Sequence, residues 1–564
     1  MNMDMQSRLT LSRYTGASEP PLIDETIGQR LLKTAARFPE HEALIVRHQG
    51  VRWTWRTFVE RIDRLAAGLL ALGIEAGDRV GIWAPNGVEW CLTQFATARI
   101  GAILVNINPA YRVFELEYAL NKSGCRAIVA AERFKSSDYL QMLQALAPEL
   151  AHCAPGHLRA AKLPALEAVI RMGGERTPGM FNFDAVAERG GPAERQRLQT
   201  IGDGLSPQDV INIQFTSGTT GNPKGAALTH HNILNNANLV AHGMRFTAAD
   251  RLCIPVPMYH CFGMVMGMLA CVATGAAAVF PADAFEPGAV LETVAAERCT
   301  ALHGVPTMFI AELEHPGFAD FDLSSLRTGI MAGAPCPVEV MKKVIASMNM
   351  AEVLIAYGQT ECSPVNHMTR ADDPLEKRVE TVGRAGPHLE VKIVDEQGEV
   401  VPVGTPGDIC TRGYAVMRGY WDDPEKTAET VDTEGWLHSG DLGVMDEEGY
   451  VAVVGRLKDM IIRGGENIYP REIEEFLFTH PKIQDAKVIG VPDEKYGEEV
   501  CAWVQPREGE SLTEDEIRAF CKANIAYFKV PKLIRLVDGF PMTITGKVQK
   551  FRMREIMEAE RRDR

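Results

Sequence analysis

Residues 216–225 read Thr-Ser-Gly-Thr-Thr-Gly-Asn-Pro-Lys-Gly and combine three glycines, four hydroxyl side chains and one lysine. They follow the apolar run 210–215, which predicts a strand that leads into a loop. Glycines let backbone N–H groups turn toward one anion, hydroxyls add donors, and lysine adds a positive charge. We therefore expect the loop to hold a polyphosphate, with a plain surface turn as the alternative. It is not a Walker A loop, because Lys224 lies between Pro223 and Gly225.

Length and composition limit the classes of protein to which the chain can belong. It has 564 residues, of which 46% are hydrophobic and 24% charged, with a net charge of -15. This length exceeds a single hydrophobic core and predicts at least two domains. The negative charge argues against nucleic acid as a partner. The 12 cysteines contain no C-x-x-C pair, so neither a zinc ribbon nor a disulfide framework is predicted.

One apolar segment has to be weighed as a membrane span. No Asp, Glu, Lys or Arg lies between Arg251 and Asp283. Prolines bracket the segment and glycines interrupt it, so its helical part is shorter than the ~20 residues that a bilayer requires. We expect a buried helix followed by a strand at 276–280, and no integral membrane segment. The N-terminus lacks the apolar core of a signal peptide. We therefore expect a cytoplasmic protein, with peripheral membrane contact left open.

The elements that position the loop follow an alternating pattern. Helical periodicity marks residues 55–72, 88–101 and 287–298, and short apolar runs that predict strands lie at 78–84, 103–107, 127–130, 276–280 and 301–304. Alternating strands and helices predict mostly parallel sheets flanked by helices, an α/β fold. The polar residues 150–208, with several Pro and Gly, predict a loop-rich surface insertion.

The texture of the sequence changes near residue 391. Short strands joined by Gly and Asp turns are predicted at 391–395, 407–412 and 449–455, which favours a small barrel-like antiparallel subdomain. A mixed pattern follows, with helices at 470–478 and 514–523 and strands at 486–491 and 499–504. We predict an N-terminal domain over 1–457 and a small α+β C-terminal domain over 458–564.

Five motifs occur together in one order. The phosphate-type loop is followed by Tyr-Gly-Gln-Thr-Glu at 357–361, Gly-Trp-Leu-His-Ser-Gly-Asp at 435–441, Gly-Arg-Leu-Lys-Asp at 455–459 and Thr-Gly-Lys at 545–547. This set resembles the adenylate-forming, AMP-binding superfamily, which includes acyl-CoA synthetases, peptide-synthetase adenylation domains and luciferases. The resemblance implies a large N-terminal domain and a small mobile C-terminal domain. It also implies that a carboxylate attacks the α-phosphorus of ATP, and that the thiol of coenzyme A then displaces AMP from the acyl-adenylate.

The resemblance assigns roles at the nucleotide site. The residues implied to bind ATP are Thr216, Ser217, Gly218, Thr219, Thr220, Gly221, Lys224, Gly333, Ala334, Pro335, Tyr357, Gly358, Thr360, Asp441 and Arg456. Glu361, with Thr216 as a further contact, would hold Mg²⁺, which prefers oxygen ligands. Asp441 would accept hydrogen bonds from the ribose hydroxyls. The alternatives are a helix N-terminal carboxylate or a surface charge at Glu361, a core aromatic at Tyr357 and an Asx-turn at Asp441.

Further roles concern the two half-reactions. Lys547 would bridge the attacking carboxylate and the α-phosphate, and Lys458 falls at the family's hinge position, where many relatives have Asp. Rotation of the small domain about this hinge would move Lys547 out of the site. It would also bring in Gly464 and Gly465, whose bare backbone would border a tunnel for coenzyme A. A solvated lysine and a simple β-turn are the alternatives.

The acyl group is expected to lie beside the apolar segment. His260 precedes that segment and would lie near the carboxylate or act as a gate, although such a histidine is more often a core residue. No acid or base is evident there, so an aliphatic acid fits better than an amino acid. The methionines Met258, Met264, Met266 and Met268 would form a deformable wall or ordinary core.

The motifs together are closest to the medium-chain fatty acid branch of the acyl-CoA synthetases. The expected substrates are a fatty acid, ATP and coenzyme A, with Mg²⁺ as cofactor. An aryl or branched-chain acid ligase is the nearest alternative. A non-catalytic nucleotide- or acyl-adenylate-binding protein is the alternative of another class, and a homodimer is left open.

Overall fold

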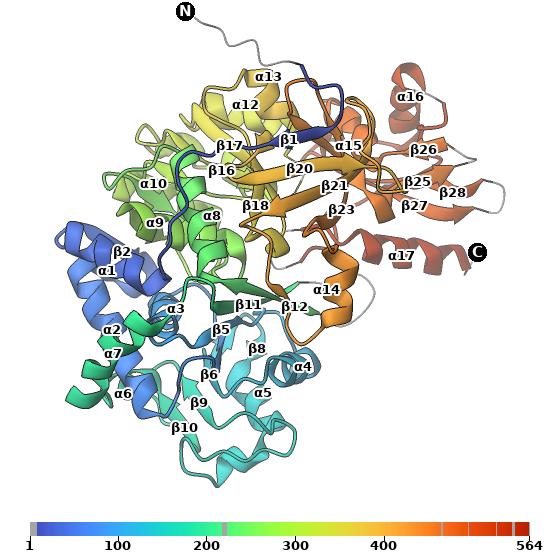
Figure 1. Cartoon of the computed structure of the whole chain (residues 1–564). Helices are drawn as coiled ribbons and strands as arrows, with labels where there is room; N and C mark the ends of the chain where they lie inside the picture. The colour runs from blue at the N-terminus through green and yellow to red at the C-terminus, as the bar shows by residue number, and fades with distance from the viewer. Residues whose placement is uncertain are drawn as a thin grey trace, which may run out of the picture.

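The computed structural model describes residues 8–216, 223–334, 336–463, 466–493, 496–525, 527–543 and 547–562. The chain forms two mixed sheets, an antiparallel sheet and a C-terminal α+β unit, and the strands of the first three are interleaved along the sequence (Figure 1). Within the described residues, no helix is both long enough and apolar enough to cross a bilayer. The α/β fold class predicted from the alternating pattern is confirmed.

The first sheet carries the strand that precedes the phosphate-type loop. Its order is β10 (Met180–Asn182), β9 (Ala168–Arg171), β6 (Ala127–Ala130), β4 (Arg79–Trp83), β5 (Ile103–Asn106), β11 (Val210–Thr216), β12 (Lys224–Thr229) and β22 (Gly419–Tyr420). Pairing is parallel from β10 to β11 and antiparallel beyond. Its neighbouring helices are α2 (Trp55–Ala71), α3 (Val88–Ile100), α4 (Val113–Ser123), α5 (Tyr139–Leu146), α6 (Phe183–Ala187) and α7 (Pro192–Gly204). A short hairpin joins β7 (Arg133–Phe134) to β8 (Ser137–Asp138).

The second sheet lies beside the first and supplies the Tyr357 motif. Its order is β19 (Arg384–Ala385), β18 (Val365–Met368), β17 (Glu352–Gly358), β16 (Thr328–Ala332), β15 (Ala301–Leu302), β13 (Arg251–Cys253), β14 (Ala277–Phe280), β2 (Glu42–Val46) and β3 (Val51–Thr54). Strands β17 to β2 pair in parallel. Its helices are α1 (Ile27–Arg37), α8 (His230–Gly243), a π-helix (Phe262–Leu269), α9 (Ala270–Thr274), α10 (Pro287–Glu297), α11 (Pro306–Leu313), α12 (Val338–Ser347) and α13 (Leu375–Glu380).

One hydrophobic cluster joins the two mixed sheets through the helices that lie with them. Helix α3 is buried from Trp90 to Ile100, with apolar residues all round rather than on one stripe. This is the pattern of a helix packed on every side. The apolar segment predicted as a buried helix and strand is confirmed as the π-helix, α9 and β14, because Met264, Val272 and Val279 are each at most 1% exposed.

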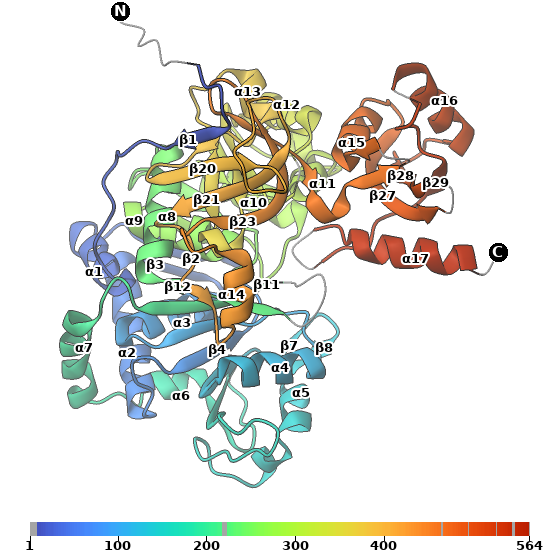
Figure 2. The same ribbon diagram turned by 45° about the vertical axis from the view of Figure 1, so that its right-hand side comes forward.

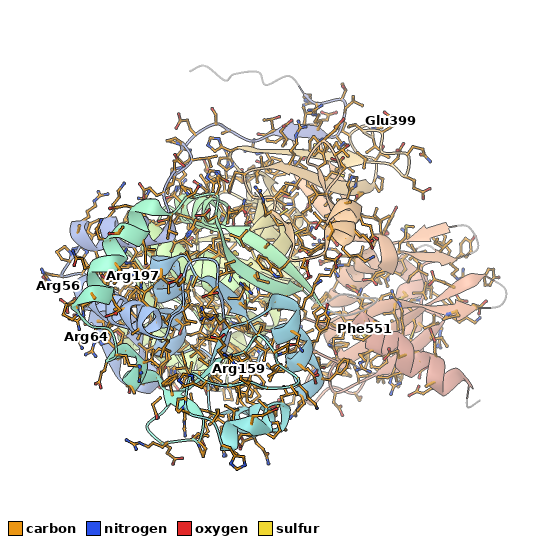
Figure 3. The ribbon with its side chains drawn as sticks, turned by 60° about the horizontal axis from the view of Figure 1, so that its bottom comes forward. Arg56, Arg64, Arg159, Arg197, Glu399 and Phe551 are labelled. Atoms are coloured by element: carbon orange, nitrogen blue, oxygen red, sulfur yellow. The ribbon has the colours of Figure 1, made fainter. Side chains whose placement is uncertain are left out.

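The surface insertion predicted over 150–208 was partly wrong. Strands β9 and β10 extend the first sheet in parallel beyond β6, and α6 and α7 pack against α2. The prediction gave too much weight to the Gly- and Pro-containing residues 173–179 and too little to the mostly apolar residues 163–172, in which Val169 and Ile170 are fully buried. Arg159 and Arg197, both labelled in Figure 3, belong to this region, and their side chains are 78% and 50% exposed.

The antiparallel sheet is the barrel-like piece predicted from residue 391. It runs in the order β1 (Arg13–Thr15), β20 (Leu389–Val394), β21 (Gly407–Gly413), β23 (Leu437–Met445) and β24 (Val451–Arg456). Helix α14 (Pro424–Thr430) leads from β22 to this sheet. A single turn of 3-10 helix, Leu457–Asp459, connects it to the C-terminal unit. The domain boundary predicted at 457/458 falls in this turn and stays a prediction.

The C-terminal unit has a core of its own and stands beside the rest of the chain (Figure 2). Its strands are β25 (Ile461–Arg463), β26 (Glu466–Ile468), β27 (Ile483–Asp493), β28 (Gly497–Pro506) and β29 (Leu533–Leu536), and its helices are α15 (Pro470–Phe478), α16 (Glu514–Asn524) and α17 (Lys550–Arg562). Arg471 on α15 donates a 2.7 Å hydrogen bond to the Val453 carbonyl on β24. Arg507 lies 3.7 Å from Glu314 beyond α11.

Candidate nucleotide and acyl-activation site

The predicted site residues come mostly from the carboxyl ends of strands. Thr216 ends β11, the Gly333–Ala334 pair follows β16, and Tyr357 and Gly358 end β17. In open α/β sheets this edge is where ligands bind, because the connections there are free to form a crevice. β16 and β17 are adjacent and parallel, with Ala332 paired to Ala356. The ladder therefore places Gly333 next to Tyr357.

Asp441 is held from two directions. The Tyr357 phenol donates a 2.8 Å hydrogen bond to Asp441 Oδ2, and Arg456 Nε lies 3.1 Å from Oδ1. The ladder sets the second contact, because Asp441 on β23 pairs directly with Arg456 on β24. Burial, followed by the nearby Asp441 charge, raises the pKa of Tyr357, so its phenol stays protonated and donates. Strands far apart in sequence thus bring together three of the predicted ATP-binding residues.

Gly358 is required by a close backbone approach. A Cβ at this position would lie 1.9 Å from the Pro364 carbonyl oxygen, so no side chain can be accommodated there without moving backbone. The tight passage sends the chain from β17 into a turn of 3-10 helix, Thr360–Cys362, which carries Glu361. The spacing of the Tyr-Gly-Gln-Thr-Glu motif is therefore a structural requirement for placing Glu361 near Tyr357.

Glu361 and Lys224 meet at one further side chain, Tyr420. Glu361 is 8% exposed, and its Oε1 accepts a 2.7 Å hydrogen bond from the Tyr420 phenol. Lys224 Nζ lies 4.3 Å from the centre of the Tyr420 ring. Within the described part of the chain, Glu361 Oε2 accepts no hydrogen bond. A carboxylate with an oxygen left for a cation suits the predicted Mg²⁺ ligand.

Lys547 reaches the same region from the C-terminal unit. A Cβ added to Gly333 would lie 3.8 Å from Lys547 Cε. Loss of hydration lowers the pKa of Lys547 and the nearby Arg456 lowers it further, whereas Asp441 and Glu361 act in the opposite direction. The backbone N–H of Lys547 donates to Thr543 Oγ1 at 3.0 Å. An ammonium placed among Arg456, Asp441 and Glu361 is positioned to meet an anion.

His260 lies close enough to be affected by Lys547. Burial, followed by the Lys547 charge, lowers the pKa of His260 to about 3, so the imidazole is neutral near pH 7. Its Nδ1 accepts a 3.2 Å hydrogen bond from the Phe262 backbone N–H at the start of the π-helix. A neutral ring that accepts one backbone hydrogen bond is compatible with the alternative of a structural histidine.

The methionines of the apolar segment are core residues. Met258, Met264, Met266 and Met268 are each at most 3% exposed. The sulfur of Met264 accepts from the buried amides of Asn106 and Gln214 at 3.5 and 3.8 Å. An open cavity of about 460 Å³ lies nearby, bordered by Pro257, Tyr259, Met308, Met542 and Thr543 among others. None of the four methionines is among the residues that border this cavity, so the structure supports ordinary core packing for them.

Several predicted residues lie outside the described part of the chain. These are Ser217, Gly218, Thr219, Thr220, Gly221, Pro335, Gly464 and Gly465. Lys458 lies in the 3-10 turn between β24 and β25. Thr216 and Lys224 flank the phosphate-type loop, and Thr216 Oγ1 lies 3.4 Å from the Lys224 carbonyl oxygen. The two ends of the loop are therefore brought together by the antiparallel pairing of β11 and β12.

Sequence reasoning missed the residues that support the site. Besides Tyr420, these are Asp408 and His438. Asp408 Oδ2 accepts from His438 Nδ1 at 2.9 Å, and Oδ1 accepts from the Gly440 N–H at 3.0 Å. Asp408 thus fixes the turn directly before Asp441, and it raises the pKa of His438. The position of His438 inside the Asp441 motif was a usable signal, whereas Asp408 required the pairing of β21 with β23.

Comparison with known families decides the relationship. The sequence pattern of the AMP-binding enzyme family matches residues 31–421, and that of the AMP-binding enzyme C-terminal domain matches residues 472–547. The chain belongs to the AMP-binding enzyme family. The resemblance to the adenylate-forming superfamily, stated from five motifs, is confirmed.

Two relatives in sequence show which members of this family the chain is similar to. The chain is 49% identical over 535 residues to YngI of Bacillus subtilis (strain 168), whose name assigns it provisionally to the acyl-CoA synthetases; the match covers 95% of this chain and 97% of that protein. It is 45% identical to the rat mitochondrial medium-chain acyl-CoA ligase ACSF2, over 97% of this chain and 90% of the relative.

Solved structures show the same fold. ATP-bound MatB from Rhodopseudomonas palustris has a TM-score of 0.79 at 29% identity, over 95% of this chain and 99% of that chain. The anthranilate CoA ligase AuaEII with anthranoyl-AMP has a TM-score of 0.84 at 25% identity, over 97% of this chain and 99% of that chain. The fold and the relatives both support the activity of an adenylate-forming acyl-CoA synthetase that uses ATP as a substrate.

Proposed function

We propose that this chain joins a medium-chain fatty acid to coenzyme A in two steps. The acid carboxylate attacks the α-phosphorus of ATP, forming acyl-adenylate and releasing pyrophosphate. The thiol then attacks the acyl carbon, the acyl–phosphate bond breaks, and AMP leaves. The observation that carries the proposal is the convergence of Lys547, Gly333, Asp441 and Glu361 from two parts of the chain. The medium-chain assignment is supported by the 45% identity to ACSF2.

Each side chain of the site would have a role that follows from its charge. Asp441 would give up its contacts with Tyr357 and Arg456 and accept hydrogen bonds from the ribose hydroxyls instead. Tyr357 would lie against the adenine. Lys547 would meet the acid carboxylate and the α-phosphate, which lowers the repulsion between two anions. Glu361 and Thr216 would hold Mg²⁺, which would neutralise phosphate charge when bound. Lys224 would contact the β- and γ-phosphates together with the loop that it follows.

We propose that this arrangement of the two parts of the chain is the one that carries out adenylation. Lys547 lies at the nucleotide site while the C-terminal unit contacts β24 through Arg471. We propose that the unit turns about the Lys458 region before thioester formation and brings Gly464 and Gly465 to the site, where coenzyme A would enter. Such a step would remove Lys547 once its half-reaction is complete.

An aryl-acid substrate is the second candidate. It is favoured by the likeness to the anthranilate CoA ligase AuaEII, whose TM-score is 0.84. At 25% identity this relationship is more distant than that to ACSF2, so the fatty acid is preferred.

The two-step reaction is tested by separating its halves. With decanoate, ATP and Mg²⁺ but no coenzyme A, we expect one equivalent of pyrophosphate per active site and enzyme-bound decanoyl-AMP, identified by mass. Addition of coenzyme A should then release AMP and decanoyl-CoA. Pyrophosphate release without an acyl-adenylate, or ATP binding without any release, would contradict the proposal.

A further inference from the structure

Tyr420 occupies a fixed place on the edge strand of the first sheet. β22 pairs antiparallel with β12, so that Tyr420 is opposite Ala226. Lys224 is two residues before Ala226 and therefore on the same face of β12. Diagonal neighbours on one face of an antiparallel pair are within reach of an aromatic ring and a long side chain. The ladder thus brings Tyr420 against Lys224 whatever the adjacent loop does.

The phenol of Tyr420 restrains Glu361. The 2.7 Å hydrogen bond to Oε1 is made inside the protein, since Tyr420 is 6% exposed and Glu361 8%. Burial, followed by the Glu361 charge, raises the pKa of Tyr420, so the phenol remains a donor. On the other side, the Glu361 carbonyl accepts from the Met417 N–H at 2.8 Å. Glu361 is therefore held both at its side-chain carboxylate and at its backbone carbonyl.

The ring of Tyr420 restrains Lys224. Nζ lies 4.3 Å from the ring centre, well within the distance at which an ammonium is attracted to an aromatic face. One side chain thus touches an anion through its hydroxyl and a cation through its ring. Glu361 and Lys224 have opposite charges and could otherwise pair directly. In the described part of the chain the two residues form no ion pair with each other, and both contact Tyr420.

We propose that Tyr420 is a positioning residue that couples the Mg²⁺ ligand Glu361 to the phosphate-binding Lys224. This inference rests on the proposed function, because it takes the roles of both residues from it. Tyr420 itself touches neither ATP nor the acid. Its hydroxyl orients the carboxylate so that Oε2 points to the cation, and its ring sets the ammonium beside the phosphates. This arrangement is specific for Mg²⁺ together with a nucleotide that carries β- and γ-phosphates. It is not specific for AMP, which lacks both phosphates.

The first test removes the hydroxyl alone. Tyr420→Phe keeps the ring beneath Lys224 and deletes the hydrogen bond to Glu361. Groups that orient metal-binding carboxylates typically contribute roughly 10–100-fold to metal affinity. We therefore expect the Mg²⁺ concentration for half-maximal adenylation to rise by about tenfold, with little change in the KM for ATP at saturating Mg²⁺. An unchanged Mg²⁺ requirement would overturn the proposal.

The second test removes the ring as well. Tyr420→Leu should also raise the KM for ATP, by about two- to fivefold beyond Tyr420→Phe, which is the range of a partly exposed cation–aromatic contact. In a Lys224→Ala background this extra effect should vanish, because the partner of the ring is absent. The same extra loss with and without Lys224 would contradict coupling through the ring.

A matched control variant and a second reaction distinguish the loss of a positioning role from general disruption of the fold. Tyr414→Phe removes a phenol that accepts from Asn236 at 3.2 Å, six residues before Tyr420 in sequence, and should leave the Mg²⁺ requirement unchanged. Thioester formation from supplied acyl-adenylate needs neither Mg²⁺ nor β- and γ-phosphates. It should therefore continue at the wild-type rate in both Tyr420 variants, and equal loss of both half-reactions would reject a positioning role.

The outcomes also separate this inference from the proposed function. If the wild-type protein forms no acyl-adenylate from any acid, the proposed function fails and the roles of Glu361 and Lys224 fall with it. If the wild type is active but the two variants match its Mg²⁺ and ATP dependence, the coupling by Tyr420 alone is rejected.

Discussion

The Tyr357 phenol donates a 2.8 Å hydrogen bond to Asp441 Oδ2 across 84 residues of chain. This bond orients the aromatic ring and the carboxylate together in the free protein. The Arg456 guanidinium completes the arrangement at 3.1 Å on the other carboxylate oxygen. The contacts join β17 of the second mixed sheet to β23 and β24 of the antiparallel sheet, so the proposed adenine and ribose subsites would lie where these two sheets meet.

Asp441→Asn is expected to weaken ATP binding. The substitution keeps the size of the side chain but removes the charge that accepts hydrogen bonds, and bonds to charged groups contribute about 1.5–3 kcal/mol. The KM for ATP should rise roughly tenfold or more, measured by pyrophosphate release at saturating acid. Asp395→Asn is the control, since Asp395 accepts from Gln397 and Glu399 in an exposed hairpin turn. Equal KM values for the two variants would contradict the ribose role.

Lys547→Ala is expected to separate the half-reactions. Loss of the ammonium should reduce adenylation by about 100-fold or more, the scale seen when one electrostatic contact to a reacting oxyanion is removed. Thioester formation from supplied acyl-adenylate should change less than about twofold. Lys550→Ala serves as the matched control, because Lys550 is ion-paired with Glu474 at 2.6 Å. A parallel fall in both half-reactions of Lys547→Ala would reject its assignment to adenylation.

The Asp408–His438 pair is expected to make stability depend on pH. Asp408 raises the pKa of His438 above its usual value, so the pair stabilises the fold fully below the unfolded pKa near 6.5 and loses this effect as pH rises through the folded value. His438→Gln should therefore lower the thermal midpoint more at about pH 5.5 than at about pH 8.5. A midpoint difference that is constant, or grows with pH, would contradict the assignment.

Glu312 is expected to destabilise the fold as pH rises. It is fully buried on α11, neither carboxyl oxygen has a hydrogen-bond partner within the described residues, and burial raises its pKa well above the usual value. Between the unfolded and folded pKa values the unfolded chain alone is ionised, which costs the fold about 1.4 kcal/mol per pH unit. Glu312→Met removes this cost.

The stabilisation by Glu312→Met should thus be larger at about pH 8 than at about pH 5, measured as the thermal midpoint of variant minus wild type. Glu314→Met is the control, since Glu314 pairs at the surface with Arg507. A benefit that shrinks with rising pH would show that Glu312 is ionised in the folded protein.

Much of the fold could be predicted because local pattern and tertiary role agree. Helix α15 and strand β6 match their predicted bounds, since proline at the first turn and a short apolar run are unambiguous signals. Strand β9 was missed although residues 163–172 are mostly apolar, because the run is short and its place in the sheet depends on pairing with β6. The composition of the local sequence does not reveal which distant strand will pair with it.

The candidate site shows the same division. Asp441 and Glu361 lie within recognisable motifs, so sequence alone identifies them. Tyr420 and Asp408 act by holding those residues, and their contacts span 59 and 30 positions. Such supports are set by strand register and could not be predicted from spacing. Lys547 was identifiable only through family resemblance, since a lone lysine on a glycine turn is usually solvated.

The most direct measurement is the coenzyme A-dependent formation of AMP from ATP and Mg²⁺ across acids from acetate to palmitate, with branched and aromatic acids included. The account predicts that kcat/KM is highest for medium-chain acids such as octanoate and decanoate, and that AMP and acyl-CoA form in equal amounts. A maximum with an aromatic acid would contradict the substrate assignment. ATP binding without AMP formation from any acid would contradict the enzymatic function itself.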